Sequence, residues 1–183
     1  MDRFTRHLRN FFAGHPIVRC DFDRGPIQRV APGFHALSIG PGPRTEFWIY
    51  VSVGGALVTK PGRPVIEFLA VSPDESDALT ERLAMTVHYH HTQTLGRGHT
   101  FPLGAPWCKG STLDHALVSL PYPFGPELEL FPLADGGQGH LLWLLPITAE
   151  ERQYKVDHGL QALETIFDTK GIRYWDAFRA SAV

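Results

Sequence analysis

The sequence predicts an α+β fold, in which one domain contains a mixed, largely antiparallel β-sheet with helices packed against it. Apolar runs of strand length occur in groups of two or three, divided by single helical segments, and this order favours α+β over a regular parallel alternation. The chain has 183 residues, of which 43% are hydrophobic and 20% charged. A chain of this size and composition typically builds one core. We therefore expect a single domain over residues 1–183.

The clearest pair of elements lies in the last third of the chain. Residues 141–147, LLWLLPI, form an apolar run that is too short to cross a membrane and too continuous for a half-exposed strand, so they predict a central strand. Thr148 stands three residues before Glu151, which is the spacing of a capping box, so a helix is expected directly after the strand. Gly159 marks a stop or bend in that helix. We expect a strand and helix unit over 140–179.

Two strands and one long helix are expected earlier in the chain. Residues 47–53 alternate between apolar and polar types with the period of a strand, and residues 65–71 form a second apolar run. The segment 72–75, SPDE, matches a capping box with proline at the first helical position. Apolar residues then repeat every fourth position from Leu79, which predicts a helix to Leu95.

Two more strands are expected on either side of a proline-rich connection. Residues 113–120 and 127–131 have strand composition, and the prolines of 121–126 favour a hairpin or a sheet edge because they remove ladder donors. At the start of the chain, arginines alternate with apolar residues, which predicts an amphipathic helix over about 3–13 that docks on the domain. The small residues 180–183 are expected to fray.

Several ordered blocks resemble the suppressor of fused family. After the helix to Leu95, the chain reads GRGHT at 96–100 and LGAPW at 103–107. The segment SLPYPFGP follows at 119–126, and the strand at 141–147 leads into PITAEER and then DHGL. The similarity spans roughly Thr45 to Phe167, and the chain is similar to the short stand-alone bacterial members of that family.

The resemblance implies binding rather than catalysis. Animal suppressor of fused proteins hold a transcription factor through a short peptide, which adds as a strand between a domain of this kind and a second domain. Short bacterial relatives are thought to act as immunity proteins that bind a cognate toxin. The animal pattern has an acidic residue where this chain has Arg97-Gly98, so only His99 matches in that loop and the animal peptide specificity is not carried over.

Five residues are candidates for binding a protein partner, because their segments resemble surface loops and because aromatic and arginine side chains anchor many interfaces. They are Arg97, His99, Trp107, Tyr122 and Phe124. Trp107 and Phe124 are equally well explained as side chains that fill the edge of the core.

An alternative function is a metal-dependent hydrolase that uses His88, His91 and His99. His88 and His91 are three residues apart and can share a helix face, but the chain lacks a His-Glu-x-x-His or Cys-x-x-Cys motif. The competing interpretation places His91 at the boundary between helix and sheet, with His88 or His90 in solvent. Because no nucleophile or cofactor motif accompanies the histidines, we expect no enzyme activity, no metal and no cofactor.

Charge and cysteine content limit the partners further. The balance of 17 basic against 19 acidic residues creates no field that would attract nucleic acid or an anionic membrane. Cys20 and Cys108 are expected to be reduced and buried, which fits the cytoplasm. The expected partner is therefore a protein, either a toxin domain or an extended peptide.

Overall fold

The computed structural model describes residues 2–183 and confirms the predicted α+β class. The strands follow the order β1-β2-β3-β4-β8-β6-β5 in one sheet, with β7 also pairing with β8. Strand β4 runs parallel to β8, whereas β1–β2, β2–β3, β3–β4, β5–β6 and β7–β8 are antiparallel. The sheet is therefore mixed and largely antiparallel.

The chain divides into two compact units, each described separately below. The first unit contains Met1–Gly96 and Leu120–Trp143, and the second contains Arg97–Ser119 and Leu144–Val183. Strand β8 supplies residues to both units. The organisation of the chain as one domain stays a prediction.

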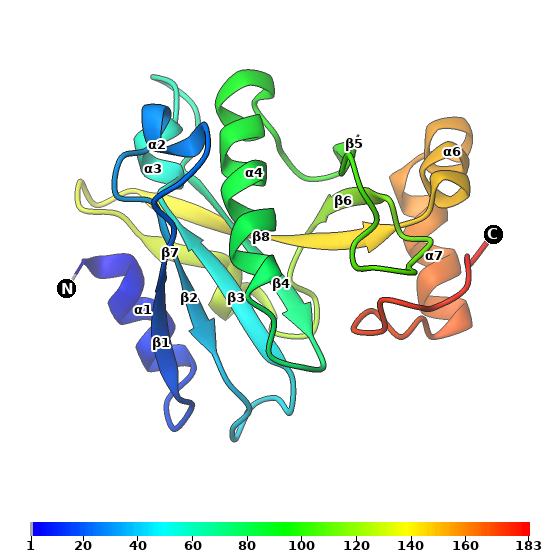
Figure 1. The fold of residues 1–183 in the computed structure, drawn as a ribbon, viewed down its shortest axis with the longest axis horizontal. Helices are drawn as coiled ribbons and strands as arrows, with labels where there is room; N and C mark the ends of the chain where they lie inside the picture. Colours follow the sequence, from blue (N-terminus) through cyan, green and yellow to red (C-terminus); the bar gives the residue numbers. More distant parts are fainter. Residues whose placement is uncertain (1) are drawn as a thin grey trace. The chain divides into compact units, whose positions relative to one another are not determined.

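Most of the sheet belongs to the first unit (Figure 1). Its strands are β1 (Ile17–Asp21), β2 (His35–Ile39), β3 (Trp48–Val53), β4 (Ile66–Ser72), β7 (Leu130–Pro132) and the first part of β8 (Gln138–Ile147). Sequence analysis did not predict β1 and β2. Ile49 and Leu69 are fully buried in neighbouring strands, so the core of this unit lies against the middle of the sheet.

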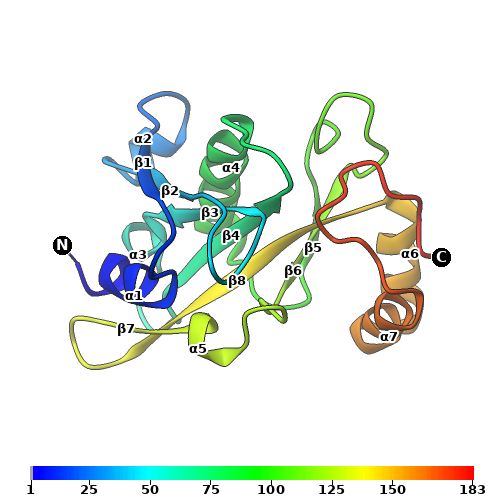
Figure 2. The same ribbon diagram turned by 90° about the horizontal axis from the view of Figure 1, so that it is seen from below.

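Helices cover both faces of these strands, as Figure 2 shows. The helices of the first unit are α1 (Arg3–Phe11), α2 (Ile27–Val30), α3 (Gly55–Val58), α4 (Ala78–Gln93) and α5 (Pro126–Glu129). Helix α4 packs on β2, β3 and β4, while α1 and α5 lie on the opposite face. Helix α1 buries Phe4, Leu8 and Phe11, and the ring of Phe4 lies 4.2 Å from that of Phe131 in β7.

The predicted capping box at residues 72–75 is wrong, although the helix that it was thought to start is real. Ser72 is the last residue of β4, where it pairs with Trp48. Helix α4 begins six residues later at Ala78, and its N-cap Asp77 makes no side-chain capping bond. The strand pairing therefore outweighs the local helix signal at Ser72.

The predicted strand over 127–131 is also wrong for most of its length. Residues Pro126–Glu129 form the short helix α5, and only Leu130–Pro132 pair as β7. Proline at the first helical position is already fixed at a helical φ and needs no N–H donor there. Leu128 is fully buried from this helical turn.

The second unit contains β5 (Thr100–Pro102), β6 (His115–Ser119), the rest of β8, α6 (Ala149–His158) and α7 (Leu160–Lys170). Both bonds of the predicted capping box are present: Glu151 N donates to Thr148 Oγ1 at 3.1 Å, and Thr148 N donates to Glu151 Oε2 at 2.9 Å. Gly159 separates α6 from α7 with a φ of 90°. Within residues 2–183, no helix is both long enough and apolar enough to cross a membrane.

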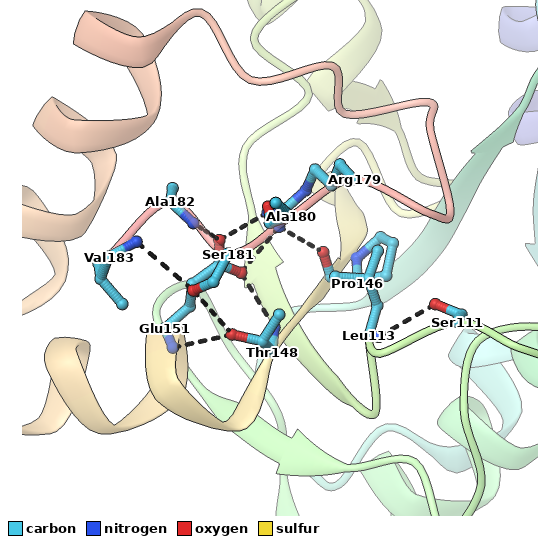
Figure 3. Close-up of polar contacts among 10 residues, drawn as sticks. All are labelled: Ser111, Leu113, Pro146, Thr148, Glu151, Arg179, Ala180, Ser181, Ala182 and Val183. Carbon is cyan, nitrogen blue, oxygen red and sulfur yellow. Dashed lines mark hydrogen bonds and ion pairs between the residues drawn. The ribbon is translucent and has the colours of Figure 1, made fainter.

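The segment Arg179–Val183 is held in place, so the prediction that residues 180–183 fray is wrong. Arg179 donates from Nη1 to Glu151 Oε1 at 2.5 Å and from Nη2 to Glu151 Oε2 at 2.8 Å (Figure 3). Nη2 also donates to Pro146 O, and Ala182 N donates to Glu151 Oε1 at 2.8 Å. Glu151 and Arg179 are 0% and 5% exposed in their side chains. We call this arrangement the Glu151–Arg179 clasp.

Candidate protein-binding surfaces

The glycine and histidine loop contains a β-bulge at the start of strand β5. Gly98 N donates to Val118 O at 2.7 Å, and Val118 N donates to His99 O at 2.9 Å. Two residues of one strand therefore face a single residue of the other, with Gly98 at a φ of 82°. This is the geometry of a G1 bulge, whose first residue is glycine because L side chains rarely adopt that φ. The bulge therefore sets the direction in which the side chain of His99 points relative to the sheet.

The same loop rests on helix α7. A Cβ atom added at Gly98 would lie 3.1 Å from Leu160 Cδ2, so glycine is needed there for space as well as for conformation. Arg97 Nη2 lies 3.3 Å from Glu164 Oε2. Arg97 thus fastens the loop to the helix, and any role in binding a partner competes with that ion pair. His99 is exposed.

Strand β5 stands at the end of the strand order and pairs with β6. Along this antiparallel ladder, the C=O group of His99 accepts a hydrogen bond from the N–H group of Val118. The N–H group of Leu103, just after β5, donates to the C=O group of Asp114. Because bonded and non-bonded residues alternate, Thr100 and Pro102 direct their backbone groups away from β6. Thr100 offers one N–H and one C=O at this edge, and Pro102 offers only a C=O.

Trp107 lies in the connection between β5 and β6 and is 6% exposed. Its backbone N–H donates to Leu113 O at 2.7 Å, so the connection folds back on itself at this residue. This placement favours the interpretation that Trp107 fills the edge of the core. The exposed aromatic residue of the second unit is instead Phe178, at 66% exposure.

Phe178 belongs to a segment that sequence analysis did not consider for binding. Ser111 Oγ donates to Ala177 O at 2.5 Å, which ties this segment to the connection between β5 and β6. Tyr174 and Trp175 pack edge to face 4.8 Å apart and are half-buried. The local sequence RYWDAFR is rich in the residue types that anchor interfaces, and this composition could have singled it out.

Tyr122 and Phe124 lie in the first unit, in the proline loop before α5. Tyr122 is 54% exposed. Phe124 is half-buried, with its ring 5.8 Å from Phe12 and 6.4 Å from Phe11 in edge-to-face packing. Tyr122 is therefore available to a partner, whereas Phe124 also secures α1. The five candidate residues are thus split between the two units.

The histidines of α4 do not form a metal centre in the described part of the chain. No group of three or more His, Cys, Asp or Glu residues within 2–183 is arranged to hold a metal ion. His90 is 4% exposed with its ring 5.5 Å from that of Phe68, so the expectation that His88 or His90 lies in solvent fails for His90. Burial lowers the pKa of His90. His88 and His91 are half-buried.

A hollow of about 330 Å³ lies in the first unit between α1, α3 and β7. Its wall is mainly apolar and includes Phe4, Leu57 and Phe131. Glu67 also lines it, and its carboxylate accepts hydrogen bonds from Ser52 Oγ and from the backbone N–H groups of Gly54 and Gly55. Burial raises the pKa of Glu67 to about 7 despite these bonds.

Cys20 and Cys108 are not joined by a disulfide in the structure, and each is half-buried rather than buried as sequence analysis expected. The candidate surfaces therefore consist of an open sheet edge, a bulged histidine loop and scattered exposed aromatic residues. These are features of a domain that binds other proteins.

The family model described as "Suppressor of fused protein (SUFU)" matches residues 31–180. The chain therefore belongs to the suppressor of fused family, as the ordered sequence blocks predicted. No curated protein sequence matches it significantly.

Solved structures show the same fold. A crystal structure described as a suppressor of fused homolog from Neisseria gonorrhoeae is 36% identical, with a TM-score of 0.85, and the match covers 99% of this chain and 95% of that one. A chain from a Sufu-Fu complex is 13% identical, with a TM-score of 0.67, over 99% and 92% of the two chains. Drosophila Suppressor of Fused is 13% identical with a TM-score of 0.60, and this chain spans 51% of it.

Proposed function

We propose that this chain is a non-catalytic protein-binding domain that receives an extended segment of its partner along the open edge of β5. The observation that carries the proposal is the bulged edge itself. Gly98 and His99 form the G1 bulge, His99 is exposed, and the backbone groups of Thr100 point away from β6. A strand added at such an edge gains affinity from backbone hydrogen bonds and specificity from side chains near them.

The composition of the edge limits how the partner is held. Pro102 offers no N–H donor, so backbone pairing is short and side-chain contacts must supply the remaining affinity. His99 is the first candidate for those contacts. Support for a protein partner also comes from the family, in which a chain of similar fold was solved in a Sufu-Fu complex.

The more specific proposal is that the partner is a toxin and that this chain is its immunity protein, which neutralises the toxin by covering its surface. The bacterial homolog of similar fold supports this, because the match spans 95% of that chain and short bacterial relatives in the family are thought to act as immunity proteins. A chain with only two cysteines and 43% hydrophobic residues fits a reducing compartment, so we place the protein in the cytoplasm. Co-expression with a toxin-like domain encoded next to this gene tests the proposal: the chain should restore growth of the host cells, and unchanged killing would refute it.

The binding edge is tested separately with partner recovered from the native host. Replacement of Thr100 by proline removes the outward N–H donor and leaves the bonds to β6 intact, because proline is tolerated where the N–H faces away from the ladder. T100P and H99A should each weaken binding about tenfold or more, which corresponds to about 1.4 kcal/mol. V156A, at an exposed position of α6, is the matched control and should bind like the parent. Equal affinity of all three variants would place the binding surface elsewhere.

A further inference from the structure

Strand β1 forms the other end of the strand order and presents an open edge of its own. Gly40 N donates to Pro16 O at 2.9 Å, and the register from Ile17 opposite Ile39 continues to Asp21 opposite His35. Bonded and non-bonded pairs alternate along this ladder. The backbone groups of Ile17, Arg19 and Asp21 therefore point away from β2. Within residues 2–183, no hydrogen bond to these outward groups is found.

The devices that usually protect an edge strand are sparse here. Proteins protect edges with short strands, charged side chains, prolines, bulges or a covering element. Strand β1 is short and carries two charged residues, but Ile17–Asp21 contains neither a proline nor a bulge. Val18 is 58% exposed. The two charged residues, Arg19 and Asp21, have opposite sign, and their side chains contact each other at 2.6 Å.

These opposite charges make the strand complementary to itself. In an antiparallel pair of two β1 strands, residues whose backbone groups point outward must lie opposite one another to form hydrogen bonds. The two-fold axis that relates the two copies can therefore pass through position 18, 19 or 20. An axis at position 19 places Arg19 against Arg19, which is unfavourable. An axis at position 18 sets Arg19 opposite Ile17 and Asp21 opposite residue 15, so neither charge faces a charge of opposite sign. An axis at Cys20 sets each Arg19 opposite Asp21 of the other copy.

We propose that β1 pairs with β1 of a second copy of this chain, in antiparallel register about a two-fold axis through Cys20. The arrangement forms two Arg19 to Asp21 pairs and satisfies the outward backbone groups of both residues. It also sets the exposed Val18 opposite Phe22, which already packs against Phe34 at 6.4 Å. The sheets of two copies become continuous through this contact.

Charge complementarity favours a second copy over an unrelated partner. A foreign strand would need an acidic residue opposite Arg19 and a basic residue opposite Asp21, two positions apart, whereas a second copy supplies both by symmetry. In this register only Arg19, Cys20 and Asp21 of each copy lie opposite strand residues of the other copy, so the contact is smaller than a standard stable interface. The dimer is therefore weak and dissociates on dilution, with a Kd of about 10⁻⁵ to 10⁻³ M.

Sedimentation across a concentration series tests the pairing through its charges. R19D places two acidic residues opposite each other and D21R places two basic residues opposite each other, so each change should weaken dimerisation about tenfold or more. The exchanged variant R19D/D21R restores opposite charges in this register and should return dimerisation to within about threefold of the parent. R63D changes the charge of an exposed loop residue outside β1 and should have no effect. A monomer at every concentration, or a dimer insensitive to R19D and D21R, would overturn the proposal.

The register is tested through Cys20. Directly opposed non-bonded residues in an antiparallel pair have Cα atoms about 4.5 Å apart, within the range of a disulfide. In a C108S background, diamide should link two copies through Cys20 by accepting the two protons and two electrons that the thiols release. C20S, which retains Cys108, should stay unlinked under the same conditions. Dimers that fail to link through Cys20 would refute this register.

Discussion

Removal of either partner of the Glu151–Arg179 clasp is expected to destabilise the second unit strongly. R179A leaves the Glu151 carboxylate buried with only its contacts to the backbone N–H groups of Thr148 and Ala182. E151A leaves the Arg179 guanidinium buried, with backbone acceptors such as Pro146 O as its remaining partners. An unpaired buried charge costs about 3 to 5 kcal/mol. Each single change should therefore remove a large part of a typical stability of about 5 to 15 kcal/mol.

The double variant E151L/R179M separates the ion pair from the space that its side chains fill. When both charges are absent, no charge is left buried without its partner, so the loss should be smaller than the sum of the two single losses. Urea unfolding gives the free energies, and hydrogen exchange at α6 checks that the effect is local. R173A, at a largely exposed ion pair with Asp176, is the matched control and should cost under about 1 kcal/mol. Losses under about 1 kcal/mol for both R179A and E151A would refute the reasoning.

Two further predictions concern the glycine loop and the buried carboxyl. G98A should lower the free energy of unfolding in urea by about 1 to 3 kcal/mol, because Gly98 has a positive φ and Leu160 lies close to the added Cβ. G96A has open space around its Cβ and should cost much less. Equal losses for the two variants would argue against the bulge. Between pH 4.5 and about 7, Glu67 keeps its proton in the folded state whereas the unfolded state has lost it, because burial raises its pKa to about 7. Its contribution to the free energy of unfolding is therefore fully present below pH 4.5 and is lost as pH rises through about 7. The stability of the parent relative to E67Q should therefore fall between these values, by an amount on the order of 3 kcal/mol, and a flat difference would contradict the buried, protonated carboxyl.

Sequence reasoning located the elements whose signals are local. Strand β8 and helix α6 were predictable because a continuous apolar run and a capping box stand side by side. The capping pattern at Ser72 gave a wrong helix start because Ser72 is paired with Trp48 as the last residue of β4. Strand β1 was missed because Ile17–Asp21 is largely exposed and lacks a clear alternation; its pairing with β2 depends on residues that are distant in sequence.

The candidate surfaces were harder to predict than the fold. A glycine-rich segment permits the positive φ that Gly98 adopts without requiring it, and the ion pair of Arg97 with Glu164 joins residues 67 positions apart. Trp107 and Phe178 show the same limit. Both are large aromatic residues in irregular segments, yet one is buried and the other exposed, because neighbours that are remote in sequence decide which ring is covered.

The Glu151–Arg179 clasp also has a consequence for synthesis of the protein on the ribosome. The corner between β8 and α6 leaves the ribosome before Arg179 does, so the Glu151 carboxylate lacks its partner until Arg179 has also emerged. Domains generally fold as units during synthesis, with earlier segments folding first. This corner instead requires a residue 28 positions further along the chain. Nascent chains that stall before Arg179 has emerged should therefore leave the second unit open to proteases and chaperones, and emergence of that arginine from the ribosome becomes the step that closes the unit.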